Sequence, residues 1–201
     1  MSSNTIVYLA SSSPRRRELL RQIGVAFAPL EPEPDEDAEA LEQPLHAETP
    51  THYVQRVTAL KLQAARARLR RRSLPDGVIL CADTTVALGR RLFGKPQDAA
   101  DAAAMLRALG GTTHRVLTAV ALAHGSHTDS ALNVSRVRMA AVDEAALQAY
   151  IASGEPFGKA GGYAVQGRAA AFIAHISGSH SGIMGLPLFE TSALLRAAGA
   201  L

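Results

Sequence analysis

The first thirty residues alternate between short apolar runs and a charged polar segment. The apolar run 6–10 predicts a strand, and the segment SSSPRRRELLRQIG follows it. In that segment Ser13 can cap a helix, Pro14 can occupy its first turn, and Gly24 can end it. A second apolar run, 25–30, predicts another short strand.

A Pro-rich acidic segment, EPEPDEDAEALEQP, comes next and is typical of a loop. The stretch 51–72 then has helical periodicity and places Val54, Val57, Lys61 and Ala64 on one stripe. Because the rest of that stripe is apolar, we expect Lys61 to point inward or into a cleft.

The remaining pattern mixes strands and helices. We first expect a strand at 78–82, a small hairpin at 86–93 and a helix that is capped by Asp98 and runs to Leu109. Long strands at 115–123 and 132–142 follow, around the turn HGSHTD, and then a helix at 143–152. The last part is expected to contain a Gly-rich stretch, a strand at 171–176, the loop SGSHSGIMGLP and a final helix at 189–198. The two long strands predict an antiparallel pair. The fold class expected is therefore α/β with a mixed twisted sheet flanked by helices, in one domain over 1–201.

Composition narrows the class of protein. With 201 residues, 47% of them hydrophobic, the chain can bury a sizeable core, which excludes a disordered chain. Its single cysteine, Cys81, can form neither an internal disulfide nor a cysteine-based zinc site, and no segment has the run of apolar residues that a membrane span needs. A cytoplasmic protein is expected. The basic residues are almost all arginine, the lysines being Lys61, Lys95 and Lys159.

The segment SSSPRR is a candidate anion site. Ser11 and Ser13 offer hydroxyls beside the free amides of a helix start, and Arg15 and Arg16 add guanidinium groups that can bind phosphate with two parallel hydrogen bonds. Taken alone, the segment fits a capped surface helix with solvated arginines equally well.

The segment CADTTV places a carboxylate directly after a buried apolar run. We expect Asp83 at the end of a strand, opening onto a cleft, where an aspartate can bind magnesium or take a proton from water. The commoner role for an aspartate in such a place is to cap a turn.

Two glycine-containing segments carry further lysines. GRRLFGK has the spacing of a P-loop, but Pro96 stands where a P-loop needs Ser or Thr for magnesium, so Lys95 is expected to touch phosphate only as a point charge. The segment GEPFGKAGGYAVQG holds Lys159 and Gln166. Glycines let a backbone approach a ligand closely, and a glutamine can pair with the N3 and O4 edge of a pyrimidine. Such a stretch is more often only a loop.

Other patterns point to no site. The seven histidines form no zinc signature, and His180 stands where a hydrolase elbow would need serine. The arginine run 66–72 could bind nucleic acid, but at a helix carboxyl end it also complements the helix dipole. Because no aromatic residues are interleaved with it, we interpret the run as a solvated face.

Taken in order, SSSPRR, the acidic region around Glu36, Lys61, ADTTV, GKP, KAGGYAVQG and GLPLFET resemble the Maf family of nucleoside triphosphate pyrophosphatases over nearly the whole chain. SPRR, ADT and YAVQG look like the branch that acts on dTTP and UTP. The resemblance implies hydrolysis between the α and β phosphates, to a nucleoside monophosphate and pyrophosphate, with a divalent metal (Mg or Mn), in a central cleft between two lobes of an ITPase-like fold.

The resemblance also implies roles for individual residues. Asp83 would be the proton acceptor and, with Glu36, would bind the metal, while Arg15, Thr84 and Gln166 would set the pyrimidine preference. The phosphate-binding set would be Ser11, Ser13, Arg16, Lys61, Lys95 and Lys159. No covalent nucleophile is needed, because a metal can polarise the phosphate and activate water.

The sequence departs from the family pattern in two places. His180 replaces the usual tyrosine, and the acidic loop 31–50 is long, so that Asp35 or Asp37 could take the role given to Glu36.

The partners expected are a nucleoside triphosphate and a second copy in a homodimer, with no membrane and no stable nucleic-acid partner. The alternative function is a non-catalytic protein that uses its arginines on nucleic acid or a cell-division partner.

Overall fold

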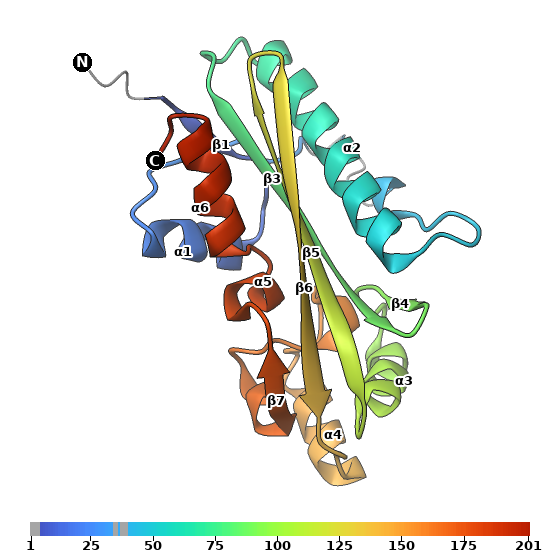
Figure 1. Ribbon diagram of the computed structural model, residues 1–201. Coiled ribbons are helices and arrows are strands. Elements are labelled where there is room, and N and C mark those ends of the chain that lie inside the picture. Colours follow the sequence, from blue (N-terminus) through green and yellow to red (C-terminus); the bar gives the residue numbers. More distant parts are fainter. Residues whose placement is uncertain (1–4, 34–35, 37–39) are drawn as a thin grey trace.

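The computed structural model describes residues 5–33, 36 and 40–201, and within them seven strands form a single mixed sheet (Figure 1). The strands are β1 (Val7–Leu9), β2 (Ala28–Pro29), β3 (Val78–Leu88), β4 (Arg91–Phe93), β5 (Thr113–His124), β6 (His127–Met139) and β7 (Ile173–Ser177). Their order is β2-β1-β3-β5-β6-β7, with β4 paired to β3. Strand β1 is parallel to both of its neighbours, and the other pairs are antiparallel. The mixed α/β sheet and the antiparallel central pair are thus confirmed.

Helices cover both sides of the sheet and its far end. They are α1 (Pro14–Gln22), α2 (Pro50–Arg71), α3 (Ala99–Leu109), α4 (Glu144–Ala152), α5 (His180–Met184) and α6 (Leu188–Ala197), with short 3₁₀ turns η1 (Ala40–Glu42), η2 (Ala160–Gly162) and η3 (Arg168–Phe172). In Figure 1, α2 runs along one side of the long strands, α1 and α6 lie on the other side near β1, and α3 and α4 lie at the far end of the sheet. The strands β3, β5 and β6 run the length of the molecule and connect the two lobes.

Each lobe is stabilised by apolar clusters of its own. In the first lobe, Val7 and Leu9 of β1 pack with α1 and α6, while Tyr8, which points to the opposite face, packs with α2. In the second lobe, α3 and α4 pack on the far ends of β3, β5 and β6, with Leu109 and Leu147 fully buried. The two lobes therefore have separate apolar cores on one continuous sheet, and the core of the first lobe has a cluster on each face of that sheet.

Strand β3 spans both cores and corrects the position expected for Asp83. Leu80 belongs to the first core and Val86 to the second, so Asp83 lies in the middle of a strand that continues to Leu88, and the prediction that it ends a strand is wrong. The strand continues because its residues remain paired with β5, with Thr84 opposite Thr118. Asp83 reaches solvent through the space between the lobes.

Other bounds also differ from those expected. Strand β6 begins at His127 instead of residue 132, because Gly125, with φ of 56°, allows a tight turn and His124 pairs with His127. The run 25–30 forms only the two-residue strand β2, and the final strand starts at Ile173. The expected loop SGSHSGIMGLP contains helix α5, whose amino terminus is capped by the Ser179 hydroxyl.

The remaining helices and the β3–β4 hairpin lie close to where the sequence placed them. Thr49 caps α2, and the Asp98 carboxylate caps α3 by accepting from the Asp101 amide. No helix in the described part of the chain has both the length and the apolar character that crossing a membrane requires.

Candidate active site

A cavity of about 730 Å³ opens between the two lobes, and all of the predicted site residues line it. They are Ser11, Ser13, Arg15, Arg16, Glu36, Lys61, Asp83, Thr84, Lys95, Lys159 and Gln166. They come from the segment between β1 and α1, from α1, from the acidic segment before η1, from α2 and β3, and from the segments after β4 and α4. Residues far apart in the sequence thus meet in one space large enough for a small-molecule ligand.

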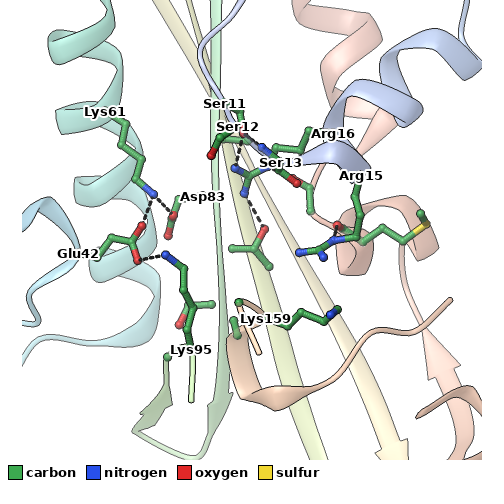
Figure 2. Close-up of a pocket in the computed structure, with 18 of the residues that line it drawn as sticks. Ser11, Ser12, Ser13, Arg15, Arg16, Glu42, Lys61, Asp83, Lys95 and Lys159 are labelled. Carbon is green, nitrogen blue, oxygen red and sulfur yellow. Dashed lines mark hydrogen bonds and ion pairs between the residues drawn. The ribbon is translucent and has the colours of Figure 1, made fainter. Parts of the chain in front are cut away.

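Asp83, Lys61 and Glu42 form a chain of charges on one wall of this cavity (Figure 2). Lys61 Nζ donates to Asp83 Oδ1 at 2.6 Å and to Glu42 Oε1 at 2.7 Å. The helical stripe predicted for Lys61 explains the geometry, since Val54 and Val57 are buried and the lysine one turn further faces the cavity. One ammonium group therefore holds two carboxylates from different segments.

Glu42 also faces a second cation. Lys95 Nζ lies 3.4 Å from Glu42 Oε2. Burial raises the pKa of Glu42, but Lys61 and Lys95 outweigh it and hold that pKa below its usual value. Glu42 was not predicted, because it is one of several acids in a Pro-rich stretch and nothing in the pattern distinguishes it from its neighbours.

The SSSPRR segment forms a second, cationic wall. Arg16 donates through Nε to Gly185 O at 2.7 Å and through Nη1 to Ser11 Oγ at 3.2 Å. Arg15 Nε donates to Met184 O at 3.4 Å. Burial lowers the pKa of both arginines, and Asp83 opposes that shift at Arg16. The bonds to Gly185 and Met184 join α1 to the end of α5.

The Gly-rich segment forms the opposite wall. Lys159 Nζ donates to the carbonyls of Glu155 and Phe157, and desolvation, with Arg15 adding to it, lowers the Lys159 pKa. Gly161 has φ of 71° and would place a Cβ 3.1 Å from Val86, so the close approach of this segment to β3 requires glycine. The Gly161 amide donates to Gly94 O at 2.9 Å, which ties the segment to the loop that carries Lys95.

Glu36 lines the same cavity, but arginines bind its carboxylate. Arg68 and Arg71 both donate to it, and the hydrogen bond from Arg68 is the main cause that lowers the Glu36 pKa to about 2. The structure therefore joins Glu42, and not Glu36, to Asp83 through Lys61. The alternatives Asp35 and Asp37 lie outside the described residues.

The sequence suggested that the arginine run at the end of α2 is a solvated face, and the structure shows that this interpretation is wrong. Arg68 is only 3% exposed and donates to Leu30 O at 2.9 Å, besides its bonds to Glu36. Arg72 Nε donates to Glu33 Oε1 at 2.5 Å. The run therefore holds the acidic segment onto α2, because the acids of that segment are its counter-ions.

Two carboxylates converging on one ammonium can accept a hard divalent cation. Magnesium is usually bound by one or two carboxylates together with substrate phosphates and water. No group of three or more His, Cys, Asp or Glu side chains with the geometry of a metal site occurs among the described residues. Asp83 and Glu42 thus fit a metal that takes its other ligands from substrate and water, and do not fit a site built from protein ligands alone.

His180, the departure from the family pattern, lies at the first position of α5 and is exposed. It is absent from the described residues that line the cavity. The histidine therefore changes the outer surface of α5 and leaves the residues that meet in the cavity in place.

Comparison with known proteins identifies the family. The family model described as "Maf-like protein" matches residues 6–198, nearly the whole chain. The chain belongs to the Maf family, as its ordered motifs had indicated.

Curated relatives are similar over almost their full length. A protein of Polaromonas sp. is 60% identical over 99% of this chain and 98% of its own, and one of Albidiferax ferrireducens is 61% identical over 96% of each. A third, from Ralstonia nicotianae, is 63% identical over 94% of this chain and 92% of its own. All three are named dTTP/UTP pyrophosphatase. Among solved structures, the Staphylococcus aureus Ham1 protein aligns with a TM-score of 0.41 and 15% identity over 67% of this chain and 71% of that chain.

Proposed function

We propose that this chain hydrolyses dTTP and UTP to the nucleoside monophosphate and pyrophosphate. The observation that carries the proposal is the cavity between the lobes, where the Asp83 carboxylate lies among cationic groups that come from both lobes. The names of relatives about 60% identical over nearly the full chain support the same substrates.

The reaction needs a water molecule, a proton acceptor and groups that neutralise the triphosphate. The water oxygen attacks the α-phosphorus, the bond from that phosphorus to the α,β-bridging oxygen breaks, and pyrophosphate leaves. Asp83 accepts the proton of the attacking water, the usual role of a positioned carboxylate beside a reacting group.

Cationic side chains bind the triphosphate from both walls. Arg16 and the amides at the start of α1 bind phosphate from one side, and Lys95 and Lys159 from the other. Lys61 keeps Asp83 and Glu42 together while the substrate enters. The lysines act as compact point charges, which suits phosphate oxygens without demanding a planar geometry.

Asp83 and Glu42 would hold the divalent metal, Mg²⁺ or Mn²⁺, with phosphate oxygens completing its ligands. When bound, such a metal neutralises charge on the phosphates and makes water easier to deprotonate. Glu36 was the other acid expected here, but its two arginine partners occupy its carboxylate.

Arg15, Thr84 and Gln166 line the cavity around the end of α5 and the Gly-rich segment, and we assign the pyrimidine base to them. The side-chain amide of Gln166 supplies both a donor and acceptor for a base edge. We further expect the reaction to take place in the cytoplasm and the chain to form a homodimer.

The test is a nucleotide panel with purified protein, in magnesium or manganese, that measures release of pyrophosphate. Wild type should release pyrophosphate from dTTP and UTP. Asp83→Asn should lower turnover about 10²- to 10⁴-fold, the usual contribution of a general base. Asp129→Asn removes the same charge from an exposed position of β6 and should leave turnover unchanged.

The outcome that contradicts the proposal is a folded wild-type protein with no turnover on any nucleotide. Tight, salt-sensitive binding of nucleic acid by such a protein would favour the alternative, because binding to phosphate backbones weakens steeply with salt. Equal turnover in wild type and Asp83→Asn would keep the activity but remove Asp83 from the mechanism.

A further inference from the structure

Two threonine hydroxyls meet on adjacent strands beside the cavity. Thr84 of β3 and Thr118 of β5 are directly paired in the sheet, and their Oγ1 atoms lie 2.9 Å apart. Thr84 lines the cavity, whereas Thr118 is 1% exposed and lies behind it. The two hydroxyls share one hydrogen bond, and the direction of that bond decides what Thr84 offers to a ligand.

The number of hydroxyl protons determines the direction of the hydrogen bond between the two threonines. Thr118 Oγ1 lies 2.7 Å from the carbonyl oxygen of Gly182, which can only accept, so the single hydroxyl proton of Thr118 points there. The proton shared between the threonines must then come from Thr84. With its own proton committed to Thr118, Thr84 presents only lone pairs on its other sides. Arg16 Nη2 donates to one of these, at 3.4 Å.

An oxygen that can only accept selects a particular edge of a base. In a uracil or thymine nucleotide the base carries one N–H group, at N3, whereas cytosine has a lone pair at N3. An acceptor facing N3 therefore forms a hydrogen bond with uracil and thymine and repels cytosine. A hydroxyl free to rotate could donate instead and would lose this preference.

We propose that Thr118 is a positioning residue for base selection. It acts through Thr84, by fixing the Thr84 hydroxyl as an acceptor for the N3–H of uracil and thymine. The inference rests on the proposed pyrimidine triphosphate substrates. It adds to them a buried residue that never touches the nucleotide but decides which base the cavity accepts.

The chain offers a matched control on the neighbouring strand. Ser135 of β6 also supports the start of α5, since the Ser179 amide donates to Ser135 Oγ at 2.9 Å. Ser135 is fully buried, like Thr118, but its partners are Ser179 and Asn133, and Thr84 is not among them. Removing its hydroxyl disturbs the support of α5 and leaves the proton direction of Thr84 unchanged.

The experiment compares Thr118→Val, Thr118→Ser and Ser135→Ala with wild type. For each, kcat/KM is measured on UTP, CTP and N3-methyl-UTP, and the affinity for the α,β-methylene analogues of UTP and CTP is measured by calorimetry, which needs no turnover. Thr118→Val should lower the preference for UTP over CTP about tenfold, the usual effect of one hydrogen bond, because the freed Thr84 hydroxyl can then donate to cytosine N3. The preference for UTP over N3-methyl-UTP should remain in Thr118→Val, because that hydroxyl can still accept from the uracil N3–H. Thr118→Ser should restore the preference, and Ser135→Ala should retain it.

Several results would overturn the proposal. The first is an unchanged preference for UTP over CTP in a Thr118→Val protein whose thermal unfolding shows that it is folded. The second is an equal loss of preference in Ser135→Ala, which would show that Thr118 affects the preference only by supporting α5. If Thr118→Val fails to fold, Thr84→Val replaces it, and an unchanged preference for UTP over N3-methyl-UTP there would overturn the proposal equally. Failure of the proposed function is separate, because wild type would then release no pyrophosphate from UTP at all.

Discussion

Lys61 Nζ lies 2.6 Å from Asp83 Oδ1, and this ion pair joins α2 to the middle of β3, where the two lobes meet. The ammonium also bonds to Glu42 at 2.7 Å. Both carboxylates are largely shielded from water, with 9% and 25% of their side chains exposed. Their closeness depends on the positive charge between them, whether a lysine or a metal supplies it.

Lys61→Met should therefore destabilise the metal-free protein. It leaves Asp83 and Glu42 as two shielded negative charges without their cation, and we expect the free energy of unfolding to fall by about 1–3 kcal/mol. Urea unfolding in a chelating buffer measures the loss. Added Mn²⁺ should stabilise Lys61→Met more than wild type, because its carboxylates have no competing ammonium.

Lys159→Met is the control for Lys61→Met, since Lys159 lies in the same cavity but bonds to backbone carbonyls. Its loss of stability should be smaller, and Mn²⁺ should stabilise it as it does wild type. A Lys61→Met protein as stable as wild type in chelating buffer would show that the shared lysine does not hold the two acids together.

A second prediction concerns the buried guanidinium of Arg68. It donates to Leu30 O and to Glu36, so Arg68→Met leaves the Leu30 carbonyl without this donor and the Glu36 carboxylate with Arg71 alone. We expect a loss of about 2–4 kcal/mol in the free energy of unfolding. Arg70→Met, at an exposed position of the same helix, should change it by less than about 0.5 kcal/mol. Similar losses in the two variants, measured by urea unfolding, would contradict the assignment.

The sequence predicted which residues meet in the cavity better than it predicted the course of the chain through it. Periodicity placed Lys61 on the inner stripe of α2, and helix-start chemistry placed Ser11 and Arg16 at a candidate anion site, because both signals are local. Asp83 was expected at a strand end, since Thr84 and Thr85 read as a polar break. Strand β3 continues because its backbone remains paired with β5 as far as Ala87, opposite Arg115, a long-range contact that no local pattern reveals.

The roles of the acids were the least predictable feature. Glu36 and Glu42 stand in one acidic stretch with the same composition around them, yet one faces Arg68 and the other faces Lys61. Which cation each acid meets depends on how the loop crosses α2, a matter of tertiary contacts. The same contacts explain why Arg68 is buried although its sequence neighbours suggested a solvated face.

The third prediction is that the free energy of unfolding depends on pH because of His114. This side chain is 1% exposed, Nε2 lies 2.7 Å from Tyr163 Oη, and Nδ1 has no hydrogen-bond partner within the described residues. Desolvation lowers the His114 pKa from 6.5 to about 4. The unfolded chain therefore binds a proton more readily, and the contribution of neutral His114 is complete above pH 6.5 and is lost as the pH falls towards 4.

The loss attributable to His114 over this window is about 3 kcal/mol at most, from 2.3RT per pKa unit. Unfolding by urea at a series of pH values measures it. His114→Gln should flatten the profile between pH 6.5 and 4. Glu36 has a pKa of about 2, and its stabilising contribution is lost only as the pH falls below the ordinary glutamate pKa of 4.5. The effects of His114 and Glu36 on stability therefore fall in different pH ranges. An unchanged slope in His114→Gln would assign the acid sensitivity elsewhere.

The last prediction tests how the chain is fixed directly after Gln166. A Cβ on Gly167 would lie 2.1 Å from Glu155 Oε1, although the backbone there, with φ of −102°, would accept any residue. Glu155 accepts from Tyr150 Oη through Oε1 at 3.2 Å and from the Arg168 amide through Oε2 at 3.0 Å, so moving the carboxylate away from the new methyl group disturbs these bonds. Gly167→Ala should therefore shift the segment that carries Gln166.

We expect the KM of Gly167→Ala for UTP to rise about tenfold or more with a smaller change in kcat, because Gln166 is assigned to base binding and Asp83 lies on a different element. Glu155→Ala supplies the control, since it removes the carboxylate that the new methyl group would meet. The double variant should have a KM no higher than that of Glu155→Ala alone. A double variant with the two single effects added together would show that the methyl group acts on something other than Glu155, because independent sites add and sites in contact do not.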